Sequence, residues 1–320
     1  MVFKLKGNDV IREQDIEVTE SLIGIYGYNN SGKTTILKEL DKVIDEENIK
    51  CIVNDGEYIR SLFIPTNRVI VRQAHTSSTP IKDIEEFLAY KKDSYNEFDL
   101  HLKVIRENML GNSAVKQVIK NAILYMFGED YEFEFDRRQS DGVENIINIY
   151  CSIIWLFTWD KDIEDIKYDR LKQLLCDTSA VVMIDEIEAF LHVYVQSRML
   201  QKFKEDFSKC SFVFTTHSPL LLSRYYNIRK FQLDNGILNE INADLYYKDL
   251  DNIYEVYFNV EEFPKEAGEI INRLGDYICG EEYNRDVIVK DLEILNEQYA
   301  NVKAKYPGLV AKAEVKLGVE

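Results

Sequence analysis

Residues 22–35 have the residue types and spacing of a phosphate-binding loop. An apolar run leads into Gly27, and after four intervening residues the chain reads Gly32, Lys33 and Thr34. This is the complete P-loop pattern, and it lies between a predicted strand and a predicted helix, as its mechanism requires. Such glycines let backbone N–H groups point at phosphates, the lysine reaches the β- and γ-phosphates, and the hydroxyl ligates Mg²⁺. The sequence therefore predicts a site for a nucleoside triphosphate, with ATP and Mg²⁺ as the expected ligands.

The residues around this loop complete the predicted phosphate site. We expect a helix from Thr34 to about residue 45 to direct its positive N-terminal end at the bound anion. The expected nucleotide contacts are Gly27, Asn29, Asn30, Ser31, Gly32, Lys33, Thr34 and Thr35. The alternative is a chance match, which the strand before the loop and the helix after it disfavour.

A second candidate site feature is the acidic pair Asp185 and Glu186, which ends the apolar run 180–184. A continuous apolar run of this length predicts a buried parallel strand. P-loop ATPases hold Mg²⁺ with a carboxylate at such a strand end, so Asp185 is a predicted metal ligand. Glu186 is the predicted general base that orients and deprotonates the attacking water. Taken alone, the pair could also be an acidic helix N-terminus.

His217 is the third candidate, in the segment Thr-Thr-His-Ser-Pro that closes the apolar run 211–216. A histidine at the carboxyl edge of a strand beside the metal-binding strand can reach a γ-phosphate. We therefore predict a catalytic role for His217 together with Glu186 and Lys33. A capping or surface histidine is the alternative.

These residues need a parallel sheet to bring them together. Apolar runs predict strands at residues 2–6, 9–18, 22–27, 61–71, 180–184 and 211–216, and a hairpin at residues 230–233 and 237–239. Helical periodicity covers residues 81–127, with Asn112 or Ser113 as the cap, and residues 191–207. Alternating strands and helices predict an α/β fold with ligands at the carboxyl ends of the strands. The predicted class is a P-loop NTPase with an inserted helical lobe at about 81–160.

The composition limits the classes of function. The chain of 320 residues is 46% hydrophobic and 30% charged, and its five cysteines show no metal-binding pair. Its net charge of −17 opposes broad attraction to a nucleic-acid backbone, so nucleic acid is a possible partner that the charge does not indicate. The apolar run 146–159 is too short to span a bilayer and predicts a buried helix. Because the N-terminal segment is charged, we expect no signal peptide there and a cytoplasmic protein without a membrane partner.

The last part of the chain is predicted to be helical. We place an ATPase domain at 1–260 and a helical extension at 261–320. Apolar residues recur there with heptad spacing at Ile288, Leu292, Leu295, Tyr299, Val302 and Tyr306, and the run stops before Pro307. This seam is either a helix that packs on its own domain or a surface for docking or oligomerisation.

Three segments carry a resemblance to a known family: residues 27–35, residues 184–192 and residues 215–219. They resemble the ABC-type ATPase heads of the overcoming-lysogenization-defect (OLD)-like group, relatives of chromosome-maintenance and double-strand-break-repair ATPases. The resemblance extends through motifs over roughly residues 1–235. That family usually has proline where Ile187 and Val193 stand in this chain.

The resemblance implies further site residues. The family has a signature segment that contacts ATP bound to the opposite subunit, and residues 139–145 are the best match, with Ser140 and Gly142 suited to a γ-phosphate. An ordinary helix cap is the alternative there. Gln73 is the candidate for the family's metal- and water-sensing glutamine. The signature implies a head-to-tail dimer with two ATP molecules between the subunits.

The leading hypothesis is a regulatory ATPase whose nucleotide-gated dimerisation controls a separate effector protein. Many members of the resembled group carry a Toprim nuclease domain, and residues 261–320 lack the acidic strand-end motifs of one. The resemblance implies a bacterial setting, often anti-phage defence. The alternative is a DNA-repair or DNA-maintenance ATPase of the SMC-like class that binds duplex DNA. A transporter ATPase and a non-hydrolysing interaction module are further alternatives.

Overall fold

The computed structural model places the chain in two compact units, residues 1–248 and 249–320. The structure describes residues 1–18, 22–53, 59–66, 102–223, 225, 227–241, 264–280 and 283–318. Each unit is described by itself below.

The first unit is built on a sheet whose described strands follow the order β4-β5-β6-β3-β7-β8. Their bounds are β3 Leu22–Tyr26, β4 Ser61–Ile64, β5 Ala180–Ile184, β6 Cys210–Thr216, β7 Ile228–Asp234 and β8 Ile237–Glu240. The neighbouring pairs are parallel except the β7–β8 hairpin, which is antiparallel. A separate antiparallel pair joins β1 (Val2–Leu5) to β2 (Gln14–Glu17). The α/β prediction with a parallel-rich P-loop NTPase sheet is confirmed.

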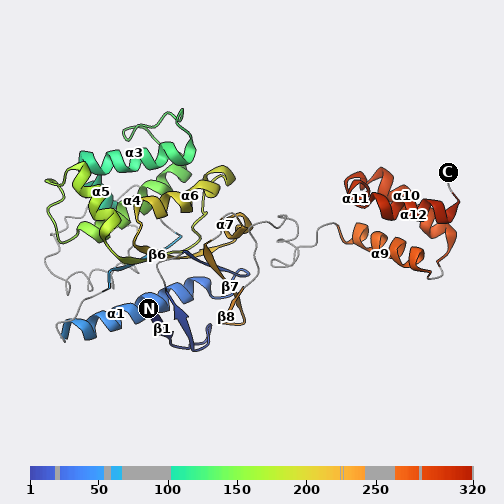
Figure 1. The fold of residues 1–320 in the computed structure, drawn as a ribbon, viewed down its shortest axis with the longest axis horizontal. Helices are drawn as coiled ribbons and strands as arrows, with labels where there is room; N and C mark the ends of the chain where they lie inside the picture. The colour runs from blue at the N-terminus through green and yellow to red at the C-terminus, as the bar shows by residue number, and fades with distance from the viewer. Residues whose placement is uncertain are drawn as a thin grey trace. The chain divides into compact units, whose positions relative to one another are not determined.

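Helix α1 (Lys33–Val53) covers one face of the sheet together with β1 and β2 (Figure 1). Because strand side chains alternate between faces, Ile23 and Ile25 of β3 enter the core on this side, beside Leu37 and Leu40 of α1. The helix is longer than predicted. Its later part is tied down by Asn48, whose amide exchanges two hydrogen bonds with the backbone of Ile59.

The opposite face of the sheet packs against a helical layer (Figure 1). Its helices are α3 (Ser113–Phe127), α4 (Asp141–Thr158), α5 (Tyr168–Asp177) and α6 (Val193–Asp206), and residues 102–111 are also helical. Gly24 of β3 faces this side, where an added Cβ would lie 2.9 Å from Leu222 and 3.2 Å from Phe214. A larger residue at this position would displace the side chains of Leu222, from α7 (Pro219–Ser223), and of Phe214, from β6.

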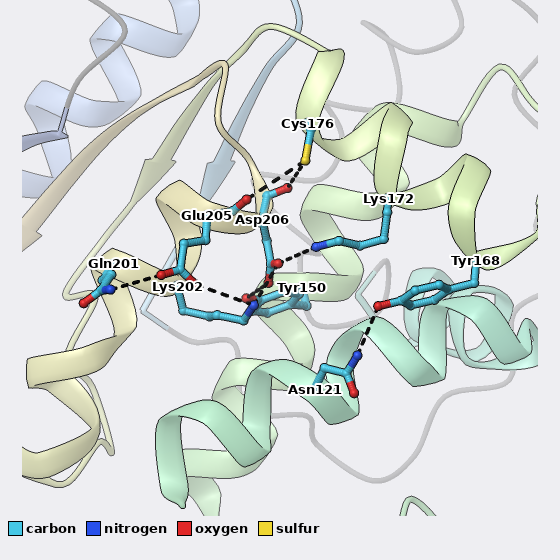
Figure 2. Close-up of polar contacts among 9 residues, drawn as sticks. All are labelled: Asn121, Tyr150, Tyr168, Lys172, Cys176, Gln201, Lys202, Glu205 and Asp206. Atoms are coloured by element: carbon cyan, nitrogen blue, oxygen red, sulfur yellow. Dashed lines mark hydrogen bonds and ion pairs between the residues drawn. The ribbon is translucent and has the colours of Figure 1, made fainter. Parts of the chain in front are cut away.

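Aromatic rings and one buried carboxylate hold the helical layer together. Tyr150, Phe203, Phe207 and Phe212 form a chain of ring contacts with centroids 5.3 to 6.4 Å apart. Asp206, at the edge of this group of rings, is only 2% exposed. It accepts hydrogen bonds from the Tyr150 hydroxyl at 2.8 Å, Lys172 Nζ at 2.7 Å and Lys202 Nζ at 2.9 Å (Figure 2). The carboxylate thus links α4, α5 and α6.

Most predicted elements of this unit match the structure. Residues 180–184 form a strand that is buried throughout. The apolar run 146–159 lies in α4 and its C-cap Trp159, and α4 is almost completely buried. Asn112 caps α3 through its side chain, which accepts from the N–H groups of Ala114 and Val115. The predicted strand 61–71 ends at Ile64 before Pro65, and residues 67–71 lie outside the described residues. No helix within the described ranges combines the length and the apolar character needed to cross a membrane.

The second unit is helical, with α9 Lys265–Cys279, α10 Arg285–Glu297, α11 Ala300–Lys305 and α12 Pro307–Leu317. The prediction of one heptad helix that ends before Pro307 is wrong. The backbone leaves the helical region at Tyr299 (φ −126°, ψ 43°) and Tyr306 (φ −117°, ψ 49°), and Pro307 begins α12. Proline suits a first helical position because no intrahelical N–H bond is lost there.

The heptad positions are used inside this second unit. Ile288, Leu295 and Val302 are buried in its own core, against residues of α9 and α12. Arg273 of α9 also forms two hydrogen bonds, at 2.9 and 2.8 Å, with the buried carboxylate of Asp291 in α10. Of the two interpretations of the heptad seam, the buried positions therefore agree with packing on its own domain.

Candidate nucleotide site

The P-loop joins β3 to α1 at the carboxyl edge of the sheet. Asn30 and Gly32 have positive φ angles of 63° and 99°, the backbone conformation with which successive N–H groups can form an anion-binding concavity. Gly27 packs so closely on β7 that an added Cβ would lie 2.7 Å from the carbonyl oxygen of Leu233. A residue larger than glycine at this position would push the loop off the sheet.

Lys33 lies inside the loop and is only 7% exposed. Its ammonium donates to the carbonyl oxygens of Gly27 at 2.8 Å and Tyr28 at 2.9 Å. Burial lowers the pKa of Lys33, while the carboxylates of Glu186 and, to a lesser degree, Asp185 and Glu188 oppose that shift. The lysine therefore already lies in the field of the acidic residues that follow β5.

Asp185 is the polar centre of the site and is 4% exposed. Its Oδ2 accepts from Thr34 Oγ1 at 2.7 Å and from Thr66 Oγ1 at 3.0 Å, and its Oδ1 accepts from Thr215 Oγ1 at 2.6 Å. The parallel order β4-β5-β6 explains this arrangement, because Asp185 and these last two threonines all stand at strand ends on one edge. The sheet thus brings the predicted pair Thr34 and Asp185 into direct contact.

Glu186 is half-buried in the turn that follows β5, with a positive φ of 43°. Thr215 holds this turn, since its hydroxyl accepts the Glu186 N–H at 2.7 Å and its carbonyl accepts the Ile187 N–H at 3.1 Å. The backbone of the predicted base is therefore tied to the end of β6. A carboxylate whose backbone is held in this way beside the predicted metal ligand is suited to proton transfer from water.

His217 follows β6 and is also half-buried. Its backbone N–H donates to Glu188 Oε1 at 2.5 Å, and the other oxygen, Oε2, is buried without a hydrogen-bond partner among the described residues. Because a buried carboxylate oxygen favours a donor, this atom is ready to accept one that arrives with a ligand. Glu188 thus joins the turn after β5 to the turn after β6.

The residues predicted from the family resemblance lie at the start of α4 or outside the described residues. Ser140 is exposed at the N-cap position of α4, and its side chain makes no capping hydrogen bond. Gly142 is buried against the turn after β5, where an added Cβ would lie 2.7 Å from the Phe190 carbonyl oxygen. Gln73 lies outside the described residues.

The donor set at Thr34 and Asp185 fits Mg²⁺. Hydroxyl and carboxylate oxygens are the ligands this hard cation prefers, and it commonly takes only one or two from the protein and the rest from phosphates and water. No cluster of three or more His, Cys, Asp or Glu side chains suited to a metal occurs within the described ranges. A pair of oxygen donors such as Thr34 and Asp185 is of the kind that binds Mg²⁺ together with the phosphates of a nucleotide.

Sequence reasoning missed Thr66 and Glu188. Thr66 comes directly after Pro65 and lies inside the predicted strand 61–71, whereas the observed strand β4 ends at Ile64. Glu188 lies two residues after Glu186, and its bond to His217 depends on the β5–β6 pairing. The available signal for Glu188 was its position just past the apolar run 180–184, and for Thr66 it was Pro65, which disfavours continuation of the strand.

Comparison with known proteins adds to this geometry. Residues 171–223 match the family described as "AAA domain, putative AbiEii toxin, Type IV TA system". This stretch includes Asp185, Glu186 and His217. The "Retron Ec83 probable ATPase" of Escherichia coli is 23% identical over 176 residues, covering 48% of this chain. These similarities support an AAA-type ATPase.

The alignment covers 32% of the retron protein, so the chain spans about a third of that curated relative's length. Among solved structures, one described as the ATP-binding subunit of an ABC transporter aligns at a TM-score of 0.43 and 16% identity, over 79% of this chain and 96% of that one. An ABC transporter in an inward-facing conformation aligns at 0.39 and 14% identity, over 80% and 87%.

Proposed function

We propose that this protein binds and hydrolyses ATP at the edge formed by the P-loop and the ends of β5 and β6. The observation that carries the proposal is the 2.7 Å hydrogen bond between Thr34 and Asp185, beside the buried ammonium of Lys33. Incoming phosphates offer Lys33 stronger acceptors than the loop carbonyls it now contacts. The P-loop N–H groups and the N-terminus of α1 hold the same anion.

The metal of this reaction would be held by Thr34 and Asp185, with Gln73 as the further predicted ligand. Bound there, Mg²⁺ would supply positive charge that offsets the negative charge developing on the phosphates during transfer. Thr66 and Thr215 keep the Asp185 carboxylate oriented toward Thr34. These hydroxyls also satisfy the carboxylate before ligands bind.

Glu186 is proposed to accept the proton of the attacking water, and His217 to contact the γ-phosphate. The Thr215 bonds support the first role because they fix the backbone from which the Glu186 carboxylate extends. The Glu188 bond supports the second role because it fixes the His217 backbone. Both residues are thereby attached to neighbouring strands of one rigid sheet.

We further propose that ATP closes a head-to-tail dimer in which Ser140 and Gly142 of one subunit approach the nucleotide of the other. Exposed apolar side chains near the site support an interface, since Phe190 is 57%, Val193 59% and Tyr28 58% exposed. Exposed Ser140, at the start of a long helix, can offer its hydroxyl to a partner's phosphate.

The proposed output is control of a separate effector protein by this nucleotide-gated dimer, in an OLD-like protein of bacterial defence. The matched family's description names a toxin and a toxin–antitoxin system, and the similar retron protein is named an ATPase. Both descriptions support a defence setting. The residues of the site themselves support the ATPase step.

Phosphate release by the purified chain tests the ATPase proposal. We expect Mg²⁺-dependent release by the wild type, with Glu186→Gln slower by about 100-fold or more and ATP affinity retained. Glu205→Gln is the matched control, because Glu205 is an exposed carboxylate near the C-terminal end of α6, outside the proposed site. Equal rates for the wild type and Glu186→Gln would reject the assigned base.

A further inference from the structure

The first turn of α4 is attached to the turn that carries Glu186. Asn145 is completely buried, and its Nδ2 donates to the carbonyl oxygen of Ala189 at 2.7 Å. The N–H of the same Ala189 donates to the carbonyl oxygen of Glu186 at 2.9 Å. Two consecutive hydrogen bonds therefore connect the Asn145 amide to the Glu186 backbone.

The turn needs such support because its backbone is strained. Glu186 has a φ of 43° and Phe190 a φ of 64°, and residues other than glycine rarely adopt such positive φ angles. Conformations of this kind persist where surrounding contacts hold them. Thr215 holds the first end of the turn, and α4 holds the other through Asn145 and the close approach of Gly142 to Phe190.

We propose that Asn145 is a positioning residue that keeps the Glu186 carboxylate at its place in the nucleotide site. This inference rests on the proposed role of Glu186 as the base. Loss of the Asn145 amide frees the Ala189 carbonyl, so the turn relaxes from its left-handed backbone and Glu186 moves. Hydrolysis then slows while the P-loop, Lys33 and Thr34 still bind ATP.

A matched pair of variants on α4 tests the proposal. Asn145→Ala removes the bond to the turn. Asn148→Ala removes a similarly buried amide of the same helix, 1% exposed, whose Oδ1 accepts from Arg106 at 3.2 Å. The measurements are the kcat of phosphate release, the dissociation constant of ATP and the thermal midpoint. Asn145→Ser repeats the test with a smaller change if the alanine variant does not fold.

We expect Asn145→Ala to lower kcat by about 10- to 100-fold, as displacement of a catalytic group does. Its ATP affinity should stay near the wild-type value, and Asn148→Ala should keep the wild-type kcat. Equal losses of kcat in both variants, or a loss of ATP affinity matching the loss of kcat, would overturn the positioning role. A wild-type kcat in Asn145→Ala would overturn this inference and leave the proposed function standing. A wild-type protein that releases no phosphate would overturn both.

Discussion

Thr34 at the start of α1 donates its hydroxyl to Asp185 at the end of β5, across 2.7 Å and 151 positions of sequence. The contact joins the two motifs that were assigned separately to metal binding. It arises because β3 and β5 flank β6 and all three strands are parallel. The proposed ATPase chemistry depends on this meeting point.

Lys33→Ala is expected to abolish ATP binding, because it removes the buried ammonium that the loop encloses. Lys38→Ala on the exposed face of the same helix is the control and should bind as the wild type does. Titration with a fluorescent ATP analogue measures both. Retained affinity in Lys33→Ala would refute the P-loop assignment.

Thr34→Val should weaken the Mg²⁺ dependence of the protein. The variant keeps the side-chain shape but loses the hydroxyl that contacts Asp185. We expect hydrolysis to need at least about tenfold more Mg²⁺ for half-maximal rate, since one of few protein ligands is lost. A rate profile against Mg²⁺ concentration, with EDTA as the zero point, gives the answer. An unchanged profile would remove Thr34 from the metal site.

Alkaline pH should destabilise the fold. Burial raises the pKa of the Cys151 and Cys210 thiols from an ordinary 9.0 to about 12. Between these values the unfolded chain has released the protons and the folded chain retains them, so the free energy of unfolding falls as pH rises. Each thiol contributes a slope of up to about 1.4 kcal/mol per pH unit.

Urea unfolding at several pH values above 8 measures this slope. Cys151→Ala should reduce it, while Cys279→Ala should not, because Cys279 is exposed. The same slope in both variants would contradict the assignment to the buried thiol.

Asp206→Ala should strongly destabilise the helical layer. It leaves Tyr150, Lys172 and Lys202 without their shared acceptor, and breaking a buried pair by removing one partner costs about 3–5 kcal/mol. The control Asp177→Ala removes an exposed carboxylate 3.5 Å from Lys209, which should cost less than about 1 kcal/mol. Chemical denaturation measures the free energy of unfolding of both variants. Similar losses in the two would show that Asp206 does not link the three helices.

Local sequence patterns predicted the elements that are set by local physics. The apolar run 180–184 became a fully buried strand, and Asn112 became a cap, because burial and capping are decided within a few residues. Contacts between distant segments were harder to predict. Thr66 reaches Asp185 across 119 positions only because β4 pairs with β5, an order that no local pattern specifies.

The heptad prediction failed for a related reason. Spacing alone does not reveal where a helix breaks. The seam is divided between α10 and α11, and Tyr299 and Tyr306, with non-helical backbone angles, stand at the breaks before α11 and α12. The same seam residues still form a core, since the short helices fold back on one another. Hydrophobic spacing thus predicted burial correctly and continuity wrongly.

We propose that ATP held at this site joins two copies of the chain until Glu186 promotes hydrolysis. Size-exclusion chromatography with light scattering on Glu186→Gln, with and without ATP and Mg²⁺, tests it most directly. We expect the Glu186→Gln variant to form a stable dimer with ATP, and the double variant Lys33→Ala, Glu186→Gln to remain monomeric. A Glu186→Gln protein that binds ATP and stays strictly monomeric would contradict the claim.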